Sequence, residues 1–217
     1  MTVPLKLIFA LFIAYILNFK IKGVGLFRTA YYVPSILGGS VAIAVLWKAL
    51  FKNDGVVNTI LTMLGFESIN FLADKNWALF IICLLRVWQF GSAMVLFLAA
   101  LKGVPEDLYE AASIDGATKW QQFKSISVPL VKPTTIYVLT ISIYAGLSMF
   151  LESYMLWKGN NSPQNIGLTI VGYLYRQGIE KRAMGYACAV GLVLLIIVMI
   201  INIIQLALTG TFKKEER

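Results

Sequence analysis

The sequence lacks the residues on which many kinds of site chemistry depend. It contains no histidine and two cysteines in 217 residues. Because Cys83 and Cys188 lie in separate apolar runs without CxxC spacing, we expect neither a metal site nor a disulfide framework. No GxxxxGK[ST] motif is present either, so the chain cannot cradle the phosphates of ATP by itself. A membrane enzyme would need a nucleophile with its base, or paired carboxylates, and is the least favoured class.

Charged residues are also scarce. They make up 14% of the chain, against 59% apolar residues and a mean hydropathy of +0.75, whereas roughly a quarter of a soluble domain is charged. This composition predicts an all-α integral membrane protein. Apolar runs close to the length that crosses a bilayer predict about five transmembrane helices, at residues 3–18, 34–51, 77–101, 134–157 and 184–209.

The net charge of +8 does not indicate a nucleic-acid partner. Its lysines and arginines are scattered among the loops and form no stripe with interleaved aromatic residues. They are typical of positive charges that flank membrane spans, and their distribution between the two sides favours neither orientation clearly. With no internal repeat or low-complexity tract, residues 1–217 are predicted to form a single transmembrane domain.

A polar insert at about 103–133 separates the third and fourth predicted spans. Pro105 suits a first helical position, and Gly116 suits a left-handed helix end. Thr118 and Gln121 then have the spacing of a capping box. Together these signals predict two short helices joined by a turn.

The surface of the insert suits contact with another protein. Ala111 and Ala112 allow a partner to approach the backbone closely, and the second helix is expected to run to Phe123, with Pro129 ending the unit. An amphipathic loop lying on the lipid headgroups is the alternative.

A longer pattern in the insert decides between these interpretations. The string Glu110-Ala111-Ala112, then Gly116, then Ile126-Ser127-Val128-Pro129 resembles the EAA loop of binding-protein-dependent ABC importer permeases. Across almost the whole chain the sequence is similar to the maltose-type carbohydrate permeases of that family. The resemblance implies the ABC importer permease fold and a cytoplasmic coupling loop for an ATPase, with coupling residues Glu110, Ala111, Ala112, Asp115, Gly116 and Pro129.

The resemblance also implies partners. They are a cytoplasmic ATPase dimer that binds the ATP, a second homologous permease, an extracytoplasmic solute-binding protein, the sugar and membrane lipid. The chain itself needs no cofactor and is no enzyme. Its expected location is the cytoplasmic (inner) membrane of a bacterium or archaeon, which it crosses several times. The family has one further N-terminal helix, which we expect to be missing here.

Arg86 lies near the middle of the third predicted span, where an exposed guanidinium costs at least about 2.5 to 3.5 kcal/mol, so it should face a cavity or a partner. By similarity to the maltose-type permeases, sugar-facing positions are Arg86, Gln89, Phe90, Ser142, Gly146 and Met149. A polar stripe at a spacing of four is predicted to border the same pathway, formed by Tyr144, Ser148 and Glu152.

Two interpretations of Arg86 remain open at this point. Glu152 either pairs with it structurally or shares in sugar recognition. A free guanidinium favours an acidic saccharide, whereas neutralisation by Glu152 leaves a neutral sugar open.

The predicted function is that of a permease subunit moving a sugar or oligosaccharide by alternating access, driven by a separate ATPase. The alternative is a secondary transporter or channel driven by an ion gradient. It would need intramembrane carboxylates, broken helices or inverted repeats, of which the sequence offers Glu152 alone.

Overall fold

The structure is a computed structural model that describes residues 2–19, 23–157 and 161–208. Within these ranges the chain is helical or lies in turns and loops, with no strand. This agrees with the predicted all-α class. The chain divides into two compact units, one of residues 1–36 and 87–142 and one of residues 37–86 and 143–217, and each is described by itself.

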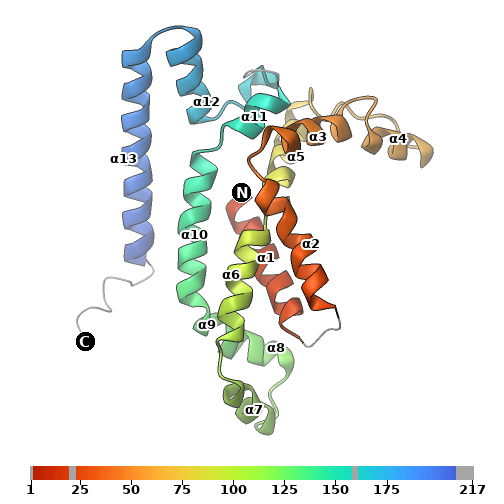
Figure 1. The fold of residues 1–217 in the computed structure, drawn as a ribbon, viewed down its shortest axis with the longest axis vertical. Helices are drawn as coiled ribbons and strands as arrows, with labels where there is room; N and C mark the ends of the chain where they lie inside the picture. Colours follow the sequence, from red (N-terminus) through yellow and green to blue (C-terminus); the bar gives the residue numbers. More distant parts are fainter. Residues whose placement is uncertain (1, 20–22, 158–160, 209–217) are drawn as a thin grey trace. The chain divides into compact units, whose positions relative to one another are not determined.

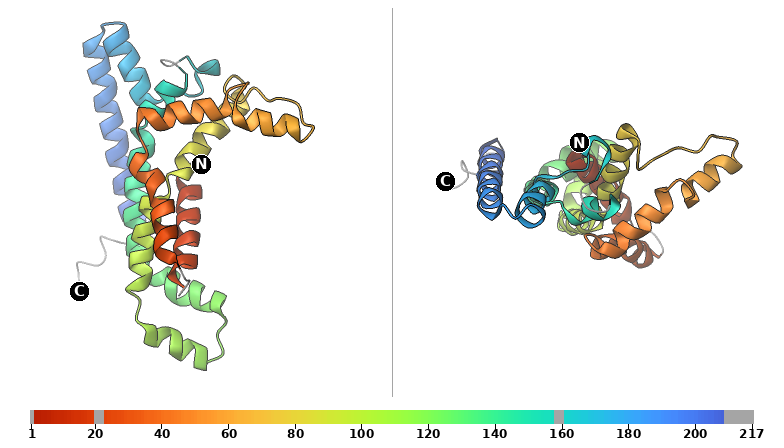
Figure 2. Two further views of the ribbon diagram at one scale, coloured as in Figure 1. Left: turned by 45° about the vertical axis from the view of Figure 1, so that its right-hand side comes forward. Right: turned by 90° about the horizontal axis from the view of Figure 1, so that it is seen from above.

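The first unit consists of apolar helices and the polar insert. Its helices are α1 (Thr2–Asn18), α2 (Val24–Leu37), α6 (Gly91–Lys102), α7 (Glu106–Ile114), α8 (Lys119–Gln122), a π-helical turn (Phe123–Ser127), α9 (Val128–Leu130) and α10 (Lys132–Leu147) up to residue 142. Figures 1 and 2 show α1 and α6 side by side.

Small residues bring these helices close together. Ala10 and Ala14 of α1 are fully buried in one core with Met94 and Phe97 of α6, and small side chains at a helix interface allow close packing of backbones in membranes. Gly91, at the start of α6, lies against the backbone of α2 so closely that a Cβ there would overlap it. The first unit is therefore a tightly packed helix group.

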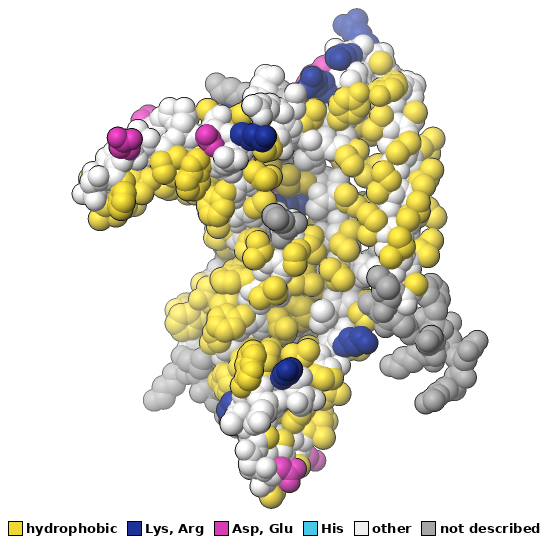
Figure 3. Space-filling model, turned by 180° about the vertical axis from the view of Figure 1, so that it is seen from behind, with side chains coloured by type: hydrophobic (Ala, Val, Ile, Leu, Met, Phe, Trp, Pro, Cys, Tyr) yellow, Lys and Arg dark blue, Asp and Glu magenta, His cyan; other side chains and the backbone are white. Residues whose placement is uncertain are grey.

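The second unit combines short helices with one long helix. Its helices are α3 (Val41–Phe51), α4 (Val56–Met63), α5 (Lys75–Trp88) up to residue 86, α11 (Leu151–Leu156), a 3₁₀ turn (Pro163–Asn165), α12 (Ile170–Tyr175), a π-helical turn (Arg176–Glu180) and α13 (Met184–Leu208). Helix α3 packs on α11, and α12 packs on α13. Figure 3 shows hydrophobic side chains along α13, as expected of a helix that faces lipid or another chain.

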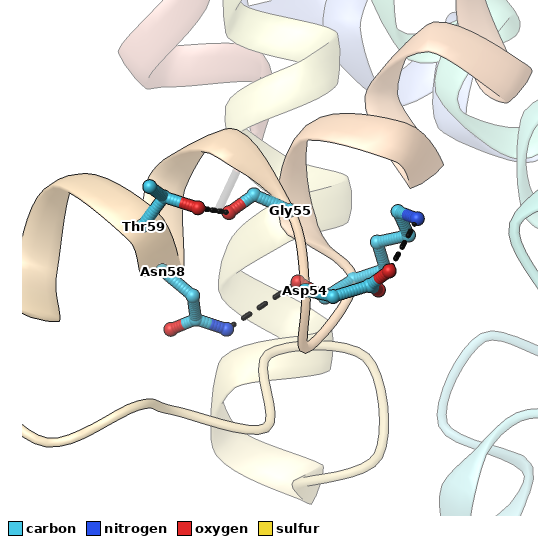
Figure 4. A network of polar contacts seen from close by, with 5 residues as sticks. Asp54, Gly55, Asn58 and Thr59 are labelled. Carbon is cyan, nitrogen blue, oxygen red and sulfur yellow. Dashed lines mark hydrogen bonds and ion pairs between the residues drawn. The ribbon is translucent and has the colours of Figure 1, made fainter.

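A buried asparagine holds the connection around α4 in place. The side-chain amide of Asn58 donates to the carbonyls of Lys52 (3.3 Å) and Ile69 (2.9 Å), and its oxygen accepts from the Ile69 N–H (2.9 Å). Asp54 nearby pairs with Lys52 at 2.7 Å, and this hydrogen bond lowers the pKa of Asp54. Figure 4 shows Asp54 and Asn58, and beside them the Thr59 hydroxyl, which donates to the Gly55 carbonyl at 3.1 Å. Asn58 thus ties together two stretches of chain that flank α4.

The predicted spans correspond to these helices with different ends. Helices α1 and α13 match 3–18 and 184–209, residue 209 lying outside the described residues. Of the described helices, α13 alone is long and apolar enough to cross a membrane. If each bent helix pair is counted as one span, the number rises to up to 4.

The prediction of continuous helices was wrong for the other three ranges. The range 77–101 is interrupted between α5 and α6, the range 134–157 between α10 and α11, and the range 34–51 joins the end of α2 to α3. The break between α2 and α3 contains Gly39 at φ +77°, a backbone conformation that glycine adopts readily. Apolar composition predicts that a segment avoids water, but it does not indicate where the helix breaks.

Candidate functional site: coupling loop and substrate pathway

The first helix of the insert begins one residue later than predicted. Pro105 has extended backbone (φ −56°, ψ 133°) and precedes α7, which starts at Glu106. Glu106 and Asp107 occupy its first turn, where the positive end of the helix dipole favours negative charge. The proline therefore sets the entry into the loop, and the acidic pair stabilises its first turn.

Gly116 ends this helix as predicted. Its φ is +77°, and the Ala117 N–H donates to the Ala112 carbonyl at 2.9 Å across it, a bond of the Schellman type. A Cβ added to Gly116 would meet no atom within 4 Å. The requirement for glycine therefore comes from backbone conformation, with no contribution from crowding.

The capping box is also present. The Thr118 side chain accepts from the Gln121 N–H (3.3 Å), and the Gln121 side chain accepts from the Thr118 N–H (2.7 Å). These reciprocal bonds start α8 directly after the glycine turn. The predicted end at Phe123 was wrong, because helix continues through a π turn and α9 to Leu130.

Pro129 consequently does not end the unit. It lies within α9, directly after the π-helical turn Phe123–Ser127. A proline in a regular helix removes a hydrogen bond and clashes with the preceding turn, but a π turn already departs from the α-helical bonding pattern. The wider turn accommodates the proline, and helix resumes as α10 at Lys132.

Four polar side chains fix the loop, and the sequence analysis assigned none of them this role. Gln122 is buried and donates to Ser113 Oγ (2.8 Å) and the Ala117 carbonyl (3.2 Å). The Tyr109 hydroxyl lies 2.8 Å from the buried Ser127 hydroxyl. No local pattern marks these residues, because their partners lie 5 to 18 positions away. They hold α7 and α8 together as one body.

The outer surface of the loop is exposed. Glu110, Ala111, Asp115, Gly116 and Pro129 are all exposed, and Ala112 is half-buried. Beside them, Ile114 is 87% and Trp120 is 68% exposed. Large apolar side chains on a polar, well-ordered loop are typical of a protein contact surface. Figure 2 shows α7 and α8 as a hairpin in which each helix can be reached from outside.

In the second unit, Arg86 and Glu152 form an ion pair. Nη1 of Arg86 lies 3.0 Å from Oε1 of Glu152, and Nη2 donates to the Ala145 carbonyl. The side chains are 18% and 5% exposed, so water screens the pair little. The sequence left open whether Glu152 pairs with Arg86 or shares in sugar recognition. In the structure the two side chains are paired.

The predicted polar stripe at a spacing of four was wrong. Helix α10 ends at Leu147, so Glu152 on α11 does not continue the face that carries Tyr144. Tyr144 is exposed, Glu152 is buried, and the Ser148 hydroxyl donates to the Tyr144 carbonyl at 2.9 Å. Because the helix breaks between them, these side chains do not share one surface.

The other predicted pathway residues differ in their surroundings. In the first unit, Ser142 is buried and Phe90 packs against Phe9 with ring centroids 4.8 Å apart. Gln89 is buried too, and its Nε2 has no hydrogen-bond partner among the described residues. In the second unit, Gly146 is exposed and Met149 is half-buried. These residues are divided between the two units, and each set is positioned only by its own unit.

Apolar helices with an exposed helix–turn–helix insert, held together by hydrogen bonds, are the features expected of a membrane permease subunit. The chain belongs to the family of binding-protein-dependent transport system inner membrane components, whose model matches residues 1–214. The predicted recognition and the location in a membrane are thereby confirmed. Subunits of this family are permeases, and ATP hydrolysis belongs to a separate subunit.

Sugar permeases are among the relatives. The chain is 43% identical over 217 residues to the arabinooligosaccharides transport system permease protein AraP of Bacillus subtilis (strain 168), covering 98% of this chain and 67% of that protein. It is 34% identical over 208 residues to the lactose transport system permease protein LacF of Rhizobium radiobacter, covering 94% and 70%. The chain thus spans about two thirds of the length of these relatives.

A solved structure has the same fold. It is the crystal structure of a bacterial alginate ABC transporter in complex with an alginate pentasaccharide-bound periplasmic protein, with a TM-score of 0.84 and 25% identity. The match covers 98% of this chain and 73% of that chain. This similarity confirms the ABC importer permease fold.

Proposed function

We propose that this chain is the permease subunit through which a sugar or oligosaccharide crosses the cytoplasmic membrane by alternating access. The exposed coupling loop is the observation that carries the proposal. In it, Gly116 and the Thr118–Gln121 capping box set the angle between α7, which bears Glu110 and Ala111, and α8. A rigid polar insert of this kind suits the transmission of motion from a separate ATPase.

The proposed partners follow from the chemistry that the chain lacks and the surfaces that it offers. An ATPase dimer docks on residues 103–133 and binds the ATP, because the chain has no phosphate-binding loop. The apolar face of α13 suits lipid or a second, homologous permease. An external solute-binding protein delivers the sugar, as in the solved importer that holds a periplasmic protein. Residues 1–217 act as one permease domain that crosses the membrane several times.

We propose that the substrate pathway includes Gln89 and the Arg86–Glu152 pair. The buried Gln89 amide has a donor that no described residue accepts, and sugar hydroxyls accept such hydrogen bonds. Arg86 is already neutralised by Glu152, which favours a neutral oligosaccharide of the arabinooligosaccharide type as the first substrate to test. An acidic oligomer of the alginate type, which the solved importer carries, is the second.

An ion-gradient-driven transporter has one feature in its favour. The bent helix pairs found here are the broken helices that such transporters use. The exposed coupling loop, however, has no role in a transporter powered by ions alone. Membership of the binding-protein-dependent family supports the ABC importer.

Gly116→Val tests the coupling role. A β-branched residue strongly disfavours positive φ, so the helix–turn–helix angle should change while the apolar helices still insert. In importer reconstituted with its ATPase, we expect uptake and ATPase copurification to fall about tenfold or more, corresponding to about 1.4 kcal/mol of docking free energy.

Gly103→Val is the matched control, because Gly103 has φ −79° and lies in the same connection. The control should transport at close to the wild-type rate. Wild-type uptake and ATPase binding by Gly116→Val would show that the loop does not couple the subunits.

A further inference from the structure

A hollow of about 540 Å³ lies in the first unit, beside the coupling loop. It is bordered by the C-terminal ends of α1 and α6, the N-terminal part of α2, and α7. Its polar lining includes Asn18, Arg28, Lys102, Glu106 and Tyr109, and the other described residues that line it are apolar. The predicted functions of the coupling loop and the substrate pathway make no use of this hollow.

One donor atom of Arg28 has no acceptor among the described residues. This atom, Nε, is buried. Buried polar atoms in proteins nearly always have a partner, and a guanidinium donor without one is especially unfavourable. An oxygen-rich ligand in the hollow would supply the missing acceptor.

The charges lining the hollow indicate which anion fits. Among the described lining residues, Arg28 and Lys102 contribute two positive charges and Glu106 one negative charge, which gives these residues a formal net charge of one positive. Neither cation forms an ion pair with Glu106 within the described ranges. A phosphodiester carries a single negative charge on two equivalent oxygens, and a guanidinium binds such a pair of oxygens in a bidentate manner. A dianionic phosphate would exceed the net positive charge that the described lining residues supply.

The position of the hollow suits a membrane lipid. It lies where the apolar helices α1 and α6 end and the polar loop begins. In the orientation of the proposed function, on which this inference rests, that level is the headgroup layer of the cytoplasmic leaflet. Basic pockets between membrane helices at this level bind anionic headgroups. The apolar part of the wall suits the glycerol and upper acyl region of the same lipid.

We propose that the hollow binds the phosphodiester headgroup of an anionic phospholipid such as phosphatidylglycerol. Arg28 and Lys102 hold the phosphate, and Glu106 limits the charge accepted to one. Tyr109 lines the hollow, and its hydroxyl lies 2.8 Å from the Ser127 hydroxyl in the π-helical turn of the coupling loop. The bound lipid is thereby in contact with the element that transmits ATPase motion.

The test uses the whole importer, purified from vesicles with equal amounts of phosphatidylglycerol and phosphatidylcholine. Native mass spectrometry counts the lipids retained per complex. Wild type should retain phosphatidylglycerol selectively, and Arg28→Gln should lower that retention about tenfold, as expected for loss of charge-assisted bonds. Lys124→Gln, which removes an exposed cation of the coupling loop outside the hollow, should retain as much as wild type.

A second variant changes the charge of the hollow in the opposite direction to Arg28→Gln. Glu106→Gln raises the net charge of the hollow, so it should retain phosphatidylglycerol at least as well as wild type and also bind dianionic phosphatidic acid. Undiminished retention by Arg28→Gln, or equal losses in Arg28→Gln and Lys124→Gln, would overturn the proposal. Displacement of the lipid by excess inorganic phosphate would assign the hollow to free phosphate instead. Lipid retention is measured without transport, so this result is independent of sugar uptake.

Discussion

Removing either member of the Arg86–Glu152 pair should destabilise the protein strongly, while removing both should not. The variants to compare are Arg86→Met, Glu152→Leu and the protein that carries both substitutions. Both side chains are largely buried, at 18% and 5% exposure. Breaking a buried ion pair leaves an uncompensated charge and costs about 3 to 5 kcal/mol, whereas an apolar pair of similar volume is often neutral or stabilising.

The surroundings of each side chain indicate how large the loss of stability should be for each variant. After Glu152→Leu, the guanidinium keeps its bond to the Ala145 carbonyl and its partial exposure, so we expect a loss of about 3 kcal/mol. After Arg86→Met, a more deeply buried carboxylate is left, and we expect about 5 kcal/mol. The double variant should lie within about 1 kcal/mol of wild type.

Unfolding in mixed detergent micelles, followed by tryptophan fluorescence, measures these differences. Uptake is measured in parallel with a neutral arabinooligosaccharide and an acidic uronate oligomer. If the pair is structural, the double variant recovers stability and neutral uptake together. If Arg86 also recognises an acidic substrate, the double variant recovers stability but loses uptake of the uronate oligomer tenfold or more.

Two results would refute the reasoning on stability. One is a single variant within about 1 kcal/mol of wild type, since that would mean water already solvates the charge that remains. The other is a double variant as unstable as the sum of the singles, since additivity is the behaviour of independent sites.

Three further results are expected. Gly91→Ala should cost about 1 to 3 kcal/mol of stability, because its Cβ meets the backbone of α2, whereas Gly103→Ala should cost less than 1 kcal/mol by the same unfolding assay. Asn58→Leu should cost about 2 kcal/mol by leaving three backbone groups without their buried partner, and unchanged stability would contradict its bridging role. In a background without the two native cysteines, Ser125→Cys should react with an impermeant thiol reagent only from the cytoplasmic side and Met63→Cys only from outside; the reverse pattern would overturn the orientation.

Local sequence signals predicted the coupling loop well. A left-handed glycine and a capping box are determined by residues within four positions of one another, so Gly116, Thr118 and Gln121 are recognisable without any knowledge of the fold. The same local reasoning missed the π turn at Phe123–Ser127. A π turn depends on how the chain is held at both of its ends, and no residue in that stretch specifies it.

Contacts between distant residues were harder to predict. The partner of Arg86 lies 66 residues away, and hydropathy left both pairing and sugar recognition open. Hydropathy also gave continuous spans where the chain breaks near Gln89 and after Leu147. Apolar composition reports that a segment is buried in the membrane, but it carries no information on where a helix bends.

The helical path from α8 to α10 has one break, at Val131, so the second half of the insert and α10 together form a bent lever. Its two arms, Lys119–Leu130 and Lys132–Leu147, meet at 66° with a single residue, Val131, at the joint. The first arm is about 18 Å long at 1.5 Å per residue. A tilt of about 10° at the joint therefore corresponds to a stroke of about 3 Å at its tip. Because only Val131 separates the two helical segments, a displacement of the loop should be transmitted to α10 without being absorbed by a flexible linker.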